Sequence, residues 1–350
     1  MGLIKILSRF IGGKFEFNRR MKEDTSPDKA LIVETDDILN EKIVVFSDHH
    51  RGDGGNKDHF KSNEDIYCRA LKEYYNNGFK LVLNGDVDEG WGYGENLQEI
   101  MESHKEKALK SENMFHADNR LYRIYGNHDD CWLDQKKVDK FLKPYMGNKE
   151  IKVYPAVYFK DDKYTLLVIH GCQGHSLHDV SDIIAKWGVR TNYGTYYEDP
   201  PVIYHGKDLD YQNELRRQEI YLLEWTMRKR LVMIGGHSHL PYFKSFPDFY
   251  RQDNELKKYL NSTSSTELGK KVIEEYLVSI KKYDRKPLKK KYKKLIENPL
   301  PLYFNCGCCT GFEEISAVEV DAGEIRLVEW NSRDKVIHHS ATLNGIFKFI

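Results

Sequence analysis

Residues 43–50 of this chain read IVVFSDHH, an apolar run that ends in residues able to bind a metal ion. A short apolar run with such an end is typical of a buried β-strand that leads into a loop. Four further runs share the pattern: KLVLNGD at 80–86, LYRIYGNHD at 121–129, YTLLVIH at 164–170 and RLVMIGGHSH at 230–239. In open α/β sheets the ligand site lies outside the carboxyl ends of the strands. We therefore expect the ends of these five runs to meet in space.

The residues at these ends form a candidate set of metal ligands: Asp48, His50, Asp86, Asn127, His170, His237 and His239. Asp48 and His50 are two residues apart on an extended segment, so both side chains lie on one face and can share an ion. Asp86 can bridge two ions through its two oxygens. Imidazole, carboxylate and amide ligands together suit Mn, Fe, Zn or Ni better than Mg or Ca. We expect two transition-metal ions, and we favour manganese.

The same pattern predicts the chemistry. Two ions about 3.5–4 Å apart form a clamp for in-line displacement at phosphorus, with the water that bridges them as the nucleophile. His128, next to a ligand, is free to protonate the leaving oxygen, and Asp129 beside it is expected to orient the ring and raise its pKa. Arg51 is a candidate for binding a substrate phosphate, with a surface salt bridge as the alternative. Each residue alone is explained as well by packing or turn chemistry, so the prediction depends on the whole set.

The blocks DHH, GDVDE, GNHD, IHG and GHSH resemble, in content and order, those of the calcineurin-like metallophosphoesterases. The resemblance covers residues 48–239. It implies a four-layer αββα fold, two packed mixed sheets flanked by helices, and a catalytic role for His128. It assigns one metal to Asp48, His50, Asp86 and His239, and the other to Asp86, Asn127, His170 and His237.

The second block departs from the family pattern, because Glu89 stands where an Asp is common. In that family the residue at this position usually contacts the metal ligands without binding the metal itself. The change therefore affects how precisely the ligands are positioned. Gly90 follows directly, whereas the protein Ser/Thr phosphatase branch has an Arg there. The blocks are closer to bacterial-type small phosphoesterases, including those that resemble UDP-diacylglucosamine hydrolases.

The order of the elements predicts one α/β domain, mixed α+β in its second half. A helix from Ile66 that is closed by Gly78, followed by a strand at 79–84, forms a βαβ unit with parallel strands. Further helices are expected at 96–115 and 212–230, and a hairpin at 152–159 and 164–169. Short strands at 302–305, 315–320 and 325–330 close the sheet. We expect an appendage at 1–40 and a single domain at 41–350, with insertions at about 172–230 and 245–300.

The composition is that of a globular protein, with 40% hydrophobic and 31% charged residues and no net charge. The N-terminus has neither the unbroken apolar core of a signal peptide nor the length of a membrane span. Six unevenly spaced cysteines indicate no disulfide framework, so we expect a cytoplasmic protein. For the amphipathic N-terminus we favour a helix packed on the domain, or a frayed end, over a peripheral membrane contact. For Cys306, Cys308 and Cys309 we favour buried thiols over a zinc site.

The predicted function is a metal-dependent phosphoester hydrolase, and the alternative is a binding module of the same fold without turnover. The substrate stays open. A nucleic acid or cyclic diester would fit the basic tract from Lys281 to Lys294, although we favour a solvated helix face or a mobile insertion as the explanation of that tract. A lipid-linked pyrophosphate would fit an N-terminus that contacts an anionic membrane. A small soluble phosphate ester would need neither segment.

Overall fold

The structure is a computed structural model that describes residues 15–55, 58–91, 96–173, 209–239, 241–242, 302–310 and 313–349. The predicted insertion at 245–300, with the Lys281–Lys294 tract, lies outside these ranges, as do residues 1–14 and 174–208. Within the described ranges, no helix is both long enough and apolar enough to cross a membrane.

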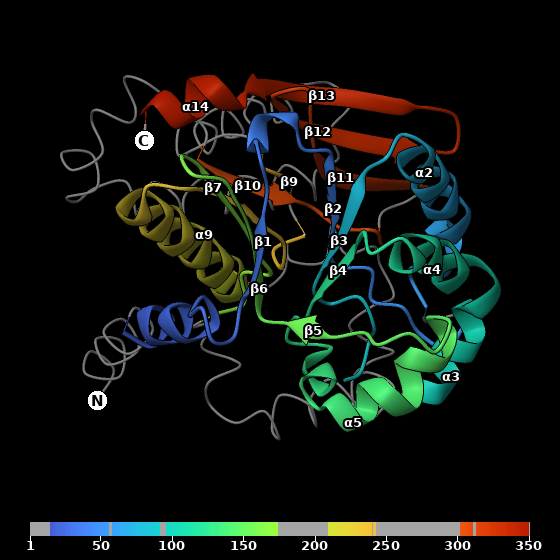
Figure 1. The fold of residues 1–350 in the computed structure, drawn as a ribbon. Helices are drawn as coiled ribbons and strands as arrows, with labels where there is room; N and C mark the ends of the chain where they lie inside the picture. Colours follow the sequence, from blue (N-terminus) through green and yellow to red (C-terminus); the bar gives the residue numbers. More distant parts are fainter. Residues whose placement is uncertain are drawn as a thin grey trace, which may run out of the picture.

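Two mixed β-sheets form the centre of the molecule (Figure 1). The six-stranded sheet has the order β1-β6-β7-β8-β10-β9 and the seven-stranded sheet β13-β12-β11-β2-β3-β4-β5. The first comprises β1 (Leu31–Glu34), β6 (Ala156–Lys160), β7 (Thr165–Ile169), β8 (Val232–Gly235), β10 (Tyr303–Cys306) and β9 (Pro241–Tyr242). The second comprises β13 (Lys335–Thr342), β12 (Glu324–Asn331), β11 (Glu314–Asp321), β2 (Ile43–Phe46), β3 (Lys80–Asn84), β4 (Leu121–Ile124) and β5 (Val153–Tyr154).

Helices flank both sheets. One side carries α2 (Glu64–Asn76), α3 (Leu97–His104), a π-helical turn (Lys105–Leu109) and α4 (Lys110–Ala117). The other carries a helix at 15–24 and α9 (Leu209–Lys229), while α14 (Leu343–Phe349) follows β13. Short helical turns lie at Ile38–Asn40, Lys61–Asn63, Asp130–Leu133, α5 (Gln135–Lys137), Val138–Leu142 and Lys143–Tyr145. The predicted fold of two mixed sheets flanked by helices is confirmed.

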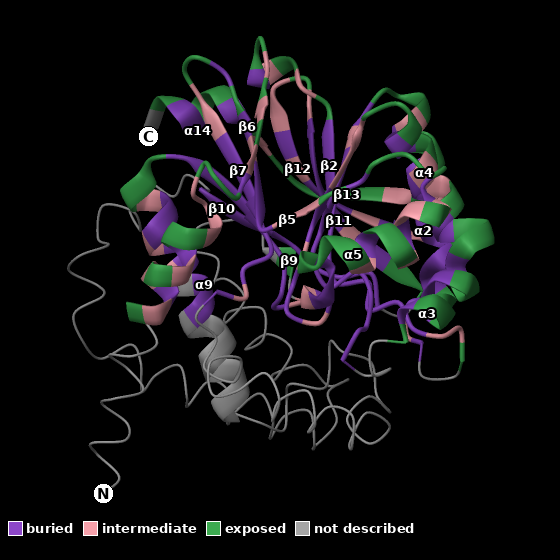
Figure 2. Cartoon of the chain, turned by 60° about the horizontal axis from the view of Figure 1, so that its bottom comes forward, coloured by how far each residue is buried: buried purple, intermediate pink, exposed green. Residues whose placement is uncertain are grey.

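The alternation of side chains along β2 shows how the layers are held together. Ile43 and Val45 pack into the cluster between the two sheets, whereas Val44 and Phe46 pack with α2 on the outer face. Successive side chains of a strand point to opposite faces, so a strand covered on both sides is apolar throughout. This is why most positions of the five runs are apolar, and Figure 2 shows the strands as a buried centre between more exposed helices.

Three expectations about the elements need correction. The sheet begins before Ile43, because β1 pairs in parallel with β6 and Phe17 and Met21 are buried, so residues 15–40 belong to the domain. α9 packs Leu222 and Trp225 on the six-stranded sheet and is a layer of the fold rather than part of an insertion. The strand expected at 152–159 is split, with β5 and β6 in different sheets. Pro155 lies at the break, since it has no N–H for a ladder hydrogen bond.

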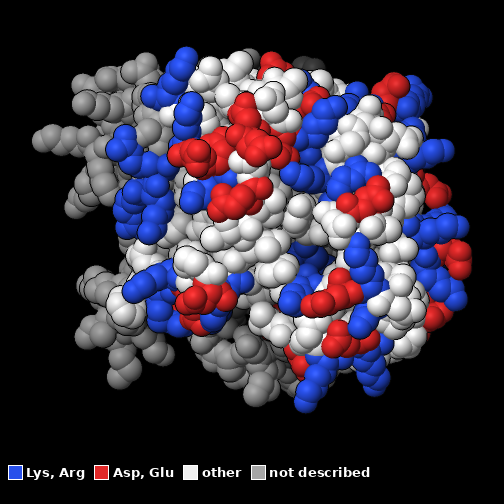
Figure 3. Space-filling model, viewed as in Figure 1, with Lys and Arg blue, Asp and Glu red and all other residues white. Residues whose placement is uncertain are grey.

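The described surface carries charges of both signs. In the view of Figure 3, Lys and Arg side chains are interspersed with Asp and Glu, and uncharged areas lie between them. This distribution fits the zero formal net charge of the chain.

Candidate metal centre

The five ligand-bearing loops meet where the two sheets come together. β2, β3 and β4 are parallel neighbours in the seven-stranded sheet, and β7 and β8 are parallel neighbours in the six-stranded sheet. Backbone hydrogen bonds continue past the strand ends, from Asp48 N to Gly85 O at 3.1 Å and from His50 N to Asp86 O at 2.9 Å. The expected convergence is present, but the five runs are divided between two sheets instead of sharing one open sheet.

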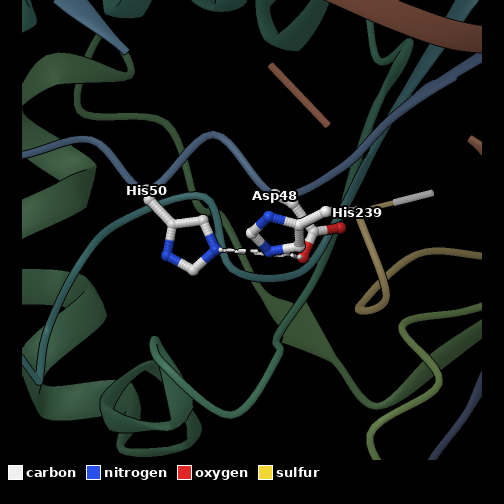
Figure 4. Close-up of side chains that lie close together, drawn as sticks. All are labelled: Asp48, His50 and His239. Atoms are coloured by element: carbon white, nitrogen blue, oxygen red, sulfur yellow. Dashed lines mark hydrogen bonds and ion pairs between the residues drawn. The ribbon is translucent and has the colours of Figure 1, made fainter. Parts of the chain in front are cut away.

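One group of candidate ligands consists of Asp48, His50 and His239 (Figure 4). His239 Nε2 lies 3.2 Å from Asp48 Oδ1 and 3.1 Å from His50 Nε2. His50 Nε2 is 3.9 Å from Asp48 Oδ1. Three ligand atoms from β2 and β8 loops thus point at one small volume, as a bound cation requires.

A second group consists of Asp86, His170 and His237. His170 Nε2 lies 3.1 Å from Asp86 Oδ2, and the same carboxylate oxygen is 4.0 Å from His50 Nε2. Asp86 therefore lies between the two groups. Its position fits a carboxylate shared by two neighbouring ions.

The unused atoms of these side chains test whether a metal fits. Asp48 Oδ1, Asn127 Oδ1 and His170 Nε2 are buried and have no hydrogen-bond partner. Buried polar atoms are nearly always hydrogen-bonded, because leaving one unpaired costs about 1–3 kcal/mol. The second oxygen of each carboxylate is hydrogen-bonded: Asp48 Oδ2 accepts from His237 N at 2.9 Å, and Asp86 Oδ1 accepts from His128 N at 2.7 Å. Each carboxylate is thus anchored by one oxygen and leaves the other for a cation. Asp86 therefore faces both groups through Oδ2 alone, and not through its two oxygens as expected.

The backbone at the ligands is unusual. Five of the candidate ligands have positive φ angles: Asp48 (54°), His50 (48°), Asp86 (49°), His237 (68°) and His239 (58°). Residues other than glycine adopt this conformation at a cost of about 1–3 kcal/mol each, and such residues cluster at functional sites. This clustering supports a functional origin of the geometry.

Close backbone approach explains two glycines of the motif blocks. A Cβ at Gly236 would lie 2.1 Å from Ser47 Oγ and 2.7 Å from Asp48 Oδ2. A Cβ at Gly126 would lie 2.2 Å from Asp86 Oδ1. A side chain at either position would displace a candidate ligand, so Gly236 lets the loops of the two sheets approach each other and Gly126 lets the loops after β3 and β4 do so within one sheet.

His128 is held by Glu89 and Trp91. Its Nδ1 lies 2.9 Å from Glu89 Oε1 and 2.8 Å from Glu89 Oε2, and its ring stacks on Trp91 with centroids 4.5 Å apart. Glu89 Oε2 is also 2.7 Å from Nδ1 of His50. Since a carboxylate only accepts, both rings donate from Nδ1 and keep Nε2 for the site. Burial alone would lower the pKa of His128, but Glu89 and Asp86 outweigh it and raise the pKa to about 9.

The role expected for Asp129 was wrong. Its carboxylate accepts hydrogen bonds from the backbone N–H groups of Gly126 at 2.6 Å, Val87 at 2.9 Å and Asp86 at 3.2 Å. Asp129 therefore fixes the loop that presents Asp86, and Glu89 orients His128. Burial, together with the nearby Asp86 charge, raises the pKa of Asp129 to about 7.

The structure also contradicts a substrate-binding role for Arg51, because its side chain is fully buried. Arg51 Nε donates to Asp88 Oδ1 at 2.9 Å, and Nη1 donates to Glu112 Oε1 at 2.8 Å. Asp88 also accepts from Arg123 and, at 2.9 Å, from Trp132 Nε1. Arg51 belongs to a buried ion network behind the site and cannot meet a phosphate.

Residues outside the motif blocks also shape the centre, and sequence patterns gave no sign of them. The Asn84 carbonyl accepts from His170 Nδ1 at 2.8 Å, which leaves Nε2 of His170 for an ion. Asn305, on β10, donates a hydrogen bond from Nδ2 to the carbonyl oxygen of Gly236 at 2.6 Å.

Cys306, Cys308 and Cys309 are buried free thiols, as expected. The described residues include no metal-ligand group that contains them.

Neither a protein-family model nor a curated protein sequence matches the chain. Solved structures do match, among them the structure of Vacuolar Protein Sorting 29 from Cryptosporidium parvum. That match has a TM-score of 0.34 and 11% sequence identity, and it covers 86% of this chain and 98% of that chain.

Proposed function

We propose that this chain is a metal-dependent phosphoester hydrolase with a dinuclear centre. The observation that carries the proposal is the position of Asp86, whose Oδ2 lies 3.1 Å from His170 Nε2 and 4.0 Å from His50 Nε2. A carboxylate between two groups of imidazoles, with its other oxygen already hydrogen-bonded, is suited to hold a pair of cations. The order of the motif blocks, which resembles that of calcineurin-like metallophosphoesterases, supports the same function.

The proposed ligands divide by location. Asp48, His50, Asp86 and His239 would hold one ion, and Asp86, Asn127, His170 and His237 would hold the other. The unpaired amide oxygen of Asn127 supports its place in the second set. Histidine-rich sets of this kind favour Mn, Fe, Zn or Ni, and we propose manganese. When bound, such a pair polarises the phosphoryl group and supplies an activated water.

The chain's own residues carry the proton transfer. His128 presents Nε2 to the site, because Glu89 engages its Nδ1 at 2.8–2.9 Å. Its pKa of about 9 keeps the ring protonated at neutral pH in the metal-free chain, the form that can give a proton to a leaving oxygen. Trp91 stacks on the ring and limits its rotation.

The experiment that tests this proposal is hydrolysis of p-nitrophenyl phosphate and bis(p-nitrophenyl) phosphate by metal-stripped protein, before and after Mn²⁺ is added. We expect turnover that depends on Mn²⁺ and that falls to background in Asp86→Asn. The matched control is Asp162→Asn, the same change at an exposed turn between β6 and β7, which should leave turnover unchanged.

Two outcomes would contradict the proposal. Unchanged turnover in Asp86→Asn would remove the dinuclear mechanism. Stoichiometric Mn²⁺ binding without hydrolysis of either ester would instead favour the alternative of a metal-binding module without catalysis. Comparing turnover of the monoester and the diester in the same assay would identify which class of phosphate ester the protein hydrolyses.

A further inference from the structure

Helix α9 contacts the loop that carries His170. Gln218 Nε2 donates to the carbonyl oxygen of Gly171 at 2.9 Å and also to the carbonyl of Gln173. Gly171 follows His170 directly and has a φ angle of +105°. A Cβ there would lie 3.2 Å from Leu222 Cδ1 of the same helix. The backbone beyond His170 is therefore pressed against α9 and hydrogen-bonded to it.

The next residue of α9 is linked to the loop that carries His237 and His239. Glu219 Oε1 accepts from Asn305 Nδ2 at 3.1 Å. The same nitrogen lies 2.6 Å from Gly236 O and 3.0 Å from Ser238 Oγ, which flank His237. Asn305 is fully buried and Glu219 is 3% exposed. The amide of Asn305 thus ties this loop to α9.

The loop needs such support. His237 and His239 both have positive φ angles, 68° and 58°. Left to itself, a backbone of this kind relaxes toward ordinary conformations, because each such residue costs about 1–3 kcal/mol. The two hydrogens of Asn305 Nδ2 are shared among Gly236 O, Ser238 Oγ and Glu219 Oε1. These contacts hold the residues on both sides of His237, so they oppose that relaxation.

We propose that Gln218 and Asn305 are positioning residues for the two ions, with α9 as the element that holds both histidine loops of the six-stranded sheet. Gln218 acts only through His170, and therefore on the second ion. Asn305, braced by Glu219, acts through His237 and His239, and therefore on both ions. This inference rests on the proposed dinuclear centre and adds residues that lie outside the motif blocks.

The test is Mn²⁺ binding to the metal-free full chain, measured by isothermal titration for wild type, Gln218→Ala and Asn305→Ala. Loss of a residue that supports a metal ligand typically lowers metal affinity about 10–100-fold. We expect Gln218→Ala to lower the affinity for one of the two ions by that factor. Asn305→Ala should lower the affinity for both ions. The matched control is Glu224→Ala, at a half-buried position on the same helix. This substitution should leave the affinity for both ions unchanged.

The outcomes separate this inference from the proposed function. If wild type binds two ions and the variants bind them as tightly, the inference is wrong and the proposed function stands. If wild type binds no Mn²⁺, both are wrong. A thermal melt of each metal-free variant checks folding. Should Asn305→Ala fail to fold, Gln218→Ala decides the question, because alanine is well tolerated in a helix.

Discussion

At the scale of single residues, Glu89 shows how one side chain serves two parts of the site. Its carboxylate contacts Nδ1 of both His50 and His128, at 2.7–2.9 Å, and is fully buried. The Glu89 side chain is long enough to reach both rings. The candidate ligand His50 and the candidate proton donor His128 are therefore oriented by the same group, with ring centroids 4.7 Å apart.

Removal of the His128 side chain should separate catalysis from metal binding. In His128→Ala the backbone N–H that holds Asp86 Oδ1 is kept, so the metal ligands stay in place. General acid catalysis is worth about 10²–10⁴-fold, and we expect kcat to fall by that factor while Mn²⁺ affinity is unchanged. His338→Ala, an exposed histidine on β13, is the control. Unaltered kcat would exclude His128 as the proton donor.

Arg51 gives a prediction about stability. Arg51→Met should lower the free energy of unfolding by about 3–5 kcal/mol, because Asp88 and Glu112 would remain buried without this partner. Urea denaturation measures the change. Arg19→Met, at a half-exposed helix position, should change it by less than about 1 kcal/mol. Equal effects of the two substitutions would contradict the importance of the buried network.

At the scale of elements, an ion triad connects α2, α3 and the segment that follows His50. His104 Nδ1 lies 2.8 Å from Glu64 Oε1, and its Nε2 lies 2.8 Å from Asp58 Oδ2. Burial would lower the pKa of His104, but the hydrogen bonds to Asp58 and Glu64 raise it to about 9. The imidazolium therefore binds its proton more tightly in the folded chain than in the unfolded one.

This triad predicts a pH dependence of stability. A folded-state pKa above the unfolded value of about 6.5 stabilises the fold fully below pH 6.5, and the contribution is lost as pH rises through about 9. The shift corresponds to roughly 3 kcal/mol. When the pH rises from about 5.5 to about 9.5, the free energy of unfolding should fall by roughly 3 kcal/mol more in wild type than in His104→Gln. Identical pH profiles from urea denaturation would show that the triad does not contribute.

Elements differed in how far the sequence could predict them. α2 ends near Gly78 as expected, because Gly78 has a φ of +80° with open space around it. β13 was missed, since it is an edge strand whose residues are mostly exposed and show no regular alternation. β1 was missed because its alternation, half-buried to exposed, is confined to four residues, LIVE.

At the scale of the whole molecule, the sequence predicted which loops meet but not how the strands divide. The candidate ligands could be found because each follows a continuous apolar run, and such runs end in loops on one side of a sheet. The division into two sheets depends on packing between distant segments, such as Val45 and Val168 in the cluster between the sheets. The supports of the site depend on the same packing, so Asn305 and Gln218 carried no local signal.

These remote loops are proposed to hold two cations around Asp86. Anomalous diffraction at the manganese edge, from crystals of the chain grown with Mn²⁺, tests this proposal most directly. We predict two peaks about 3.5–4 Å apart, one against Asp48, His50 and His239 and the other against Asn127, His170 and His237, with Asp86 between them. No peak at Asp86, or a single peak that leaves His170 and His237 without a metal, would contradict the account.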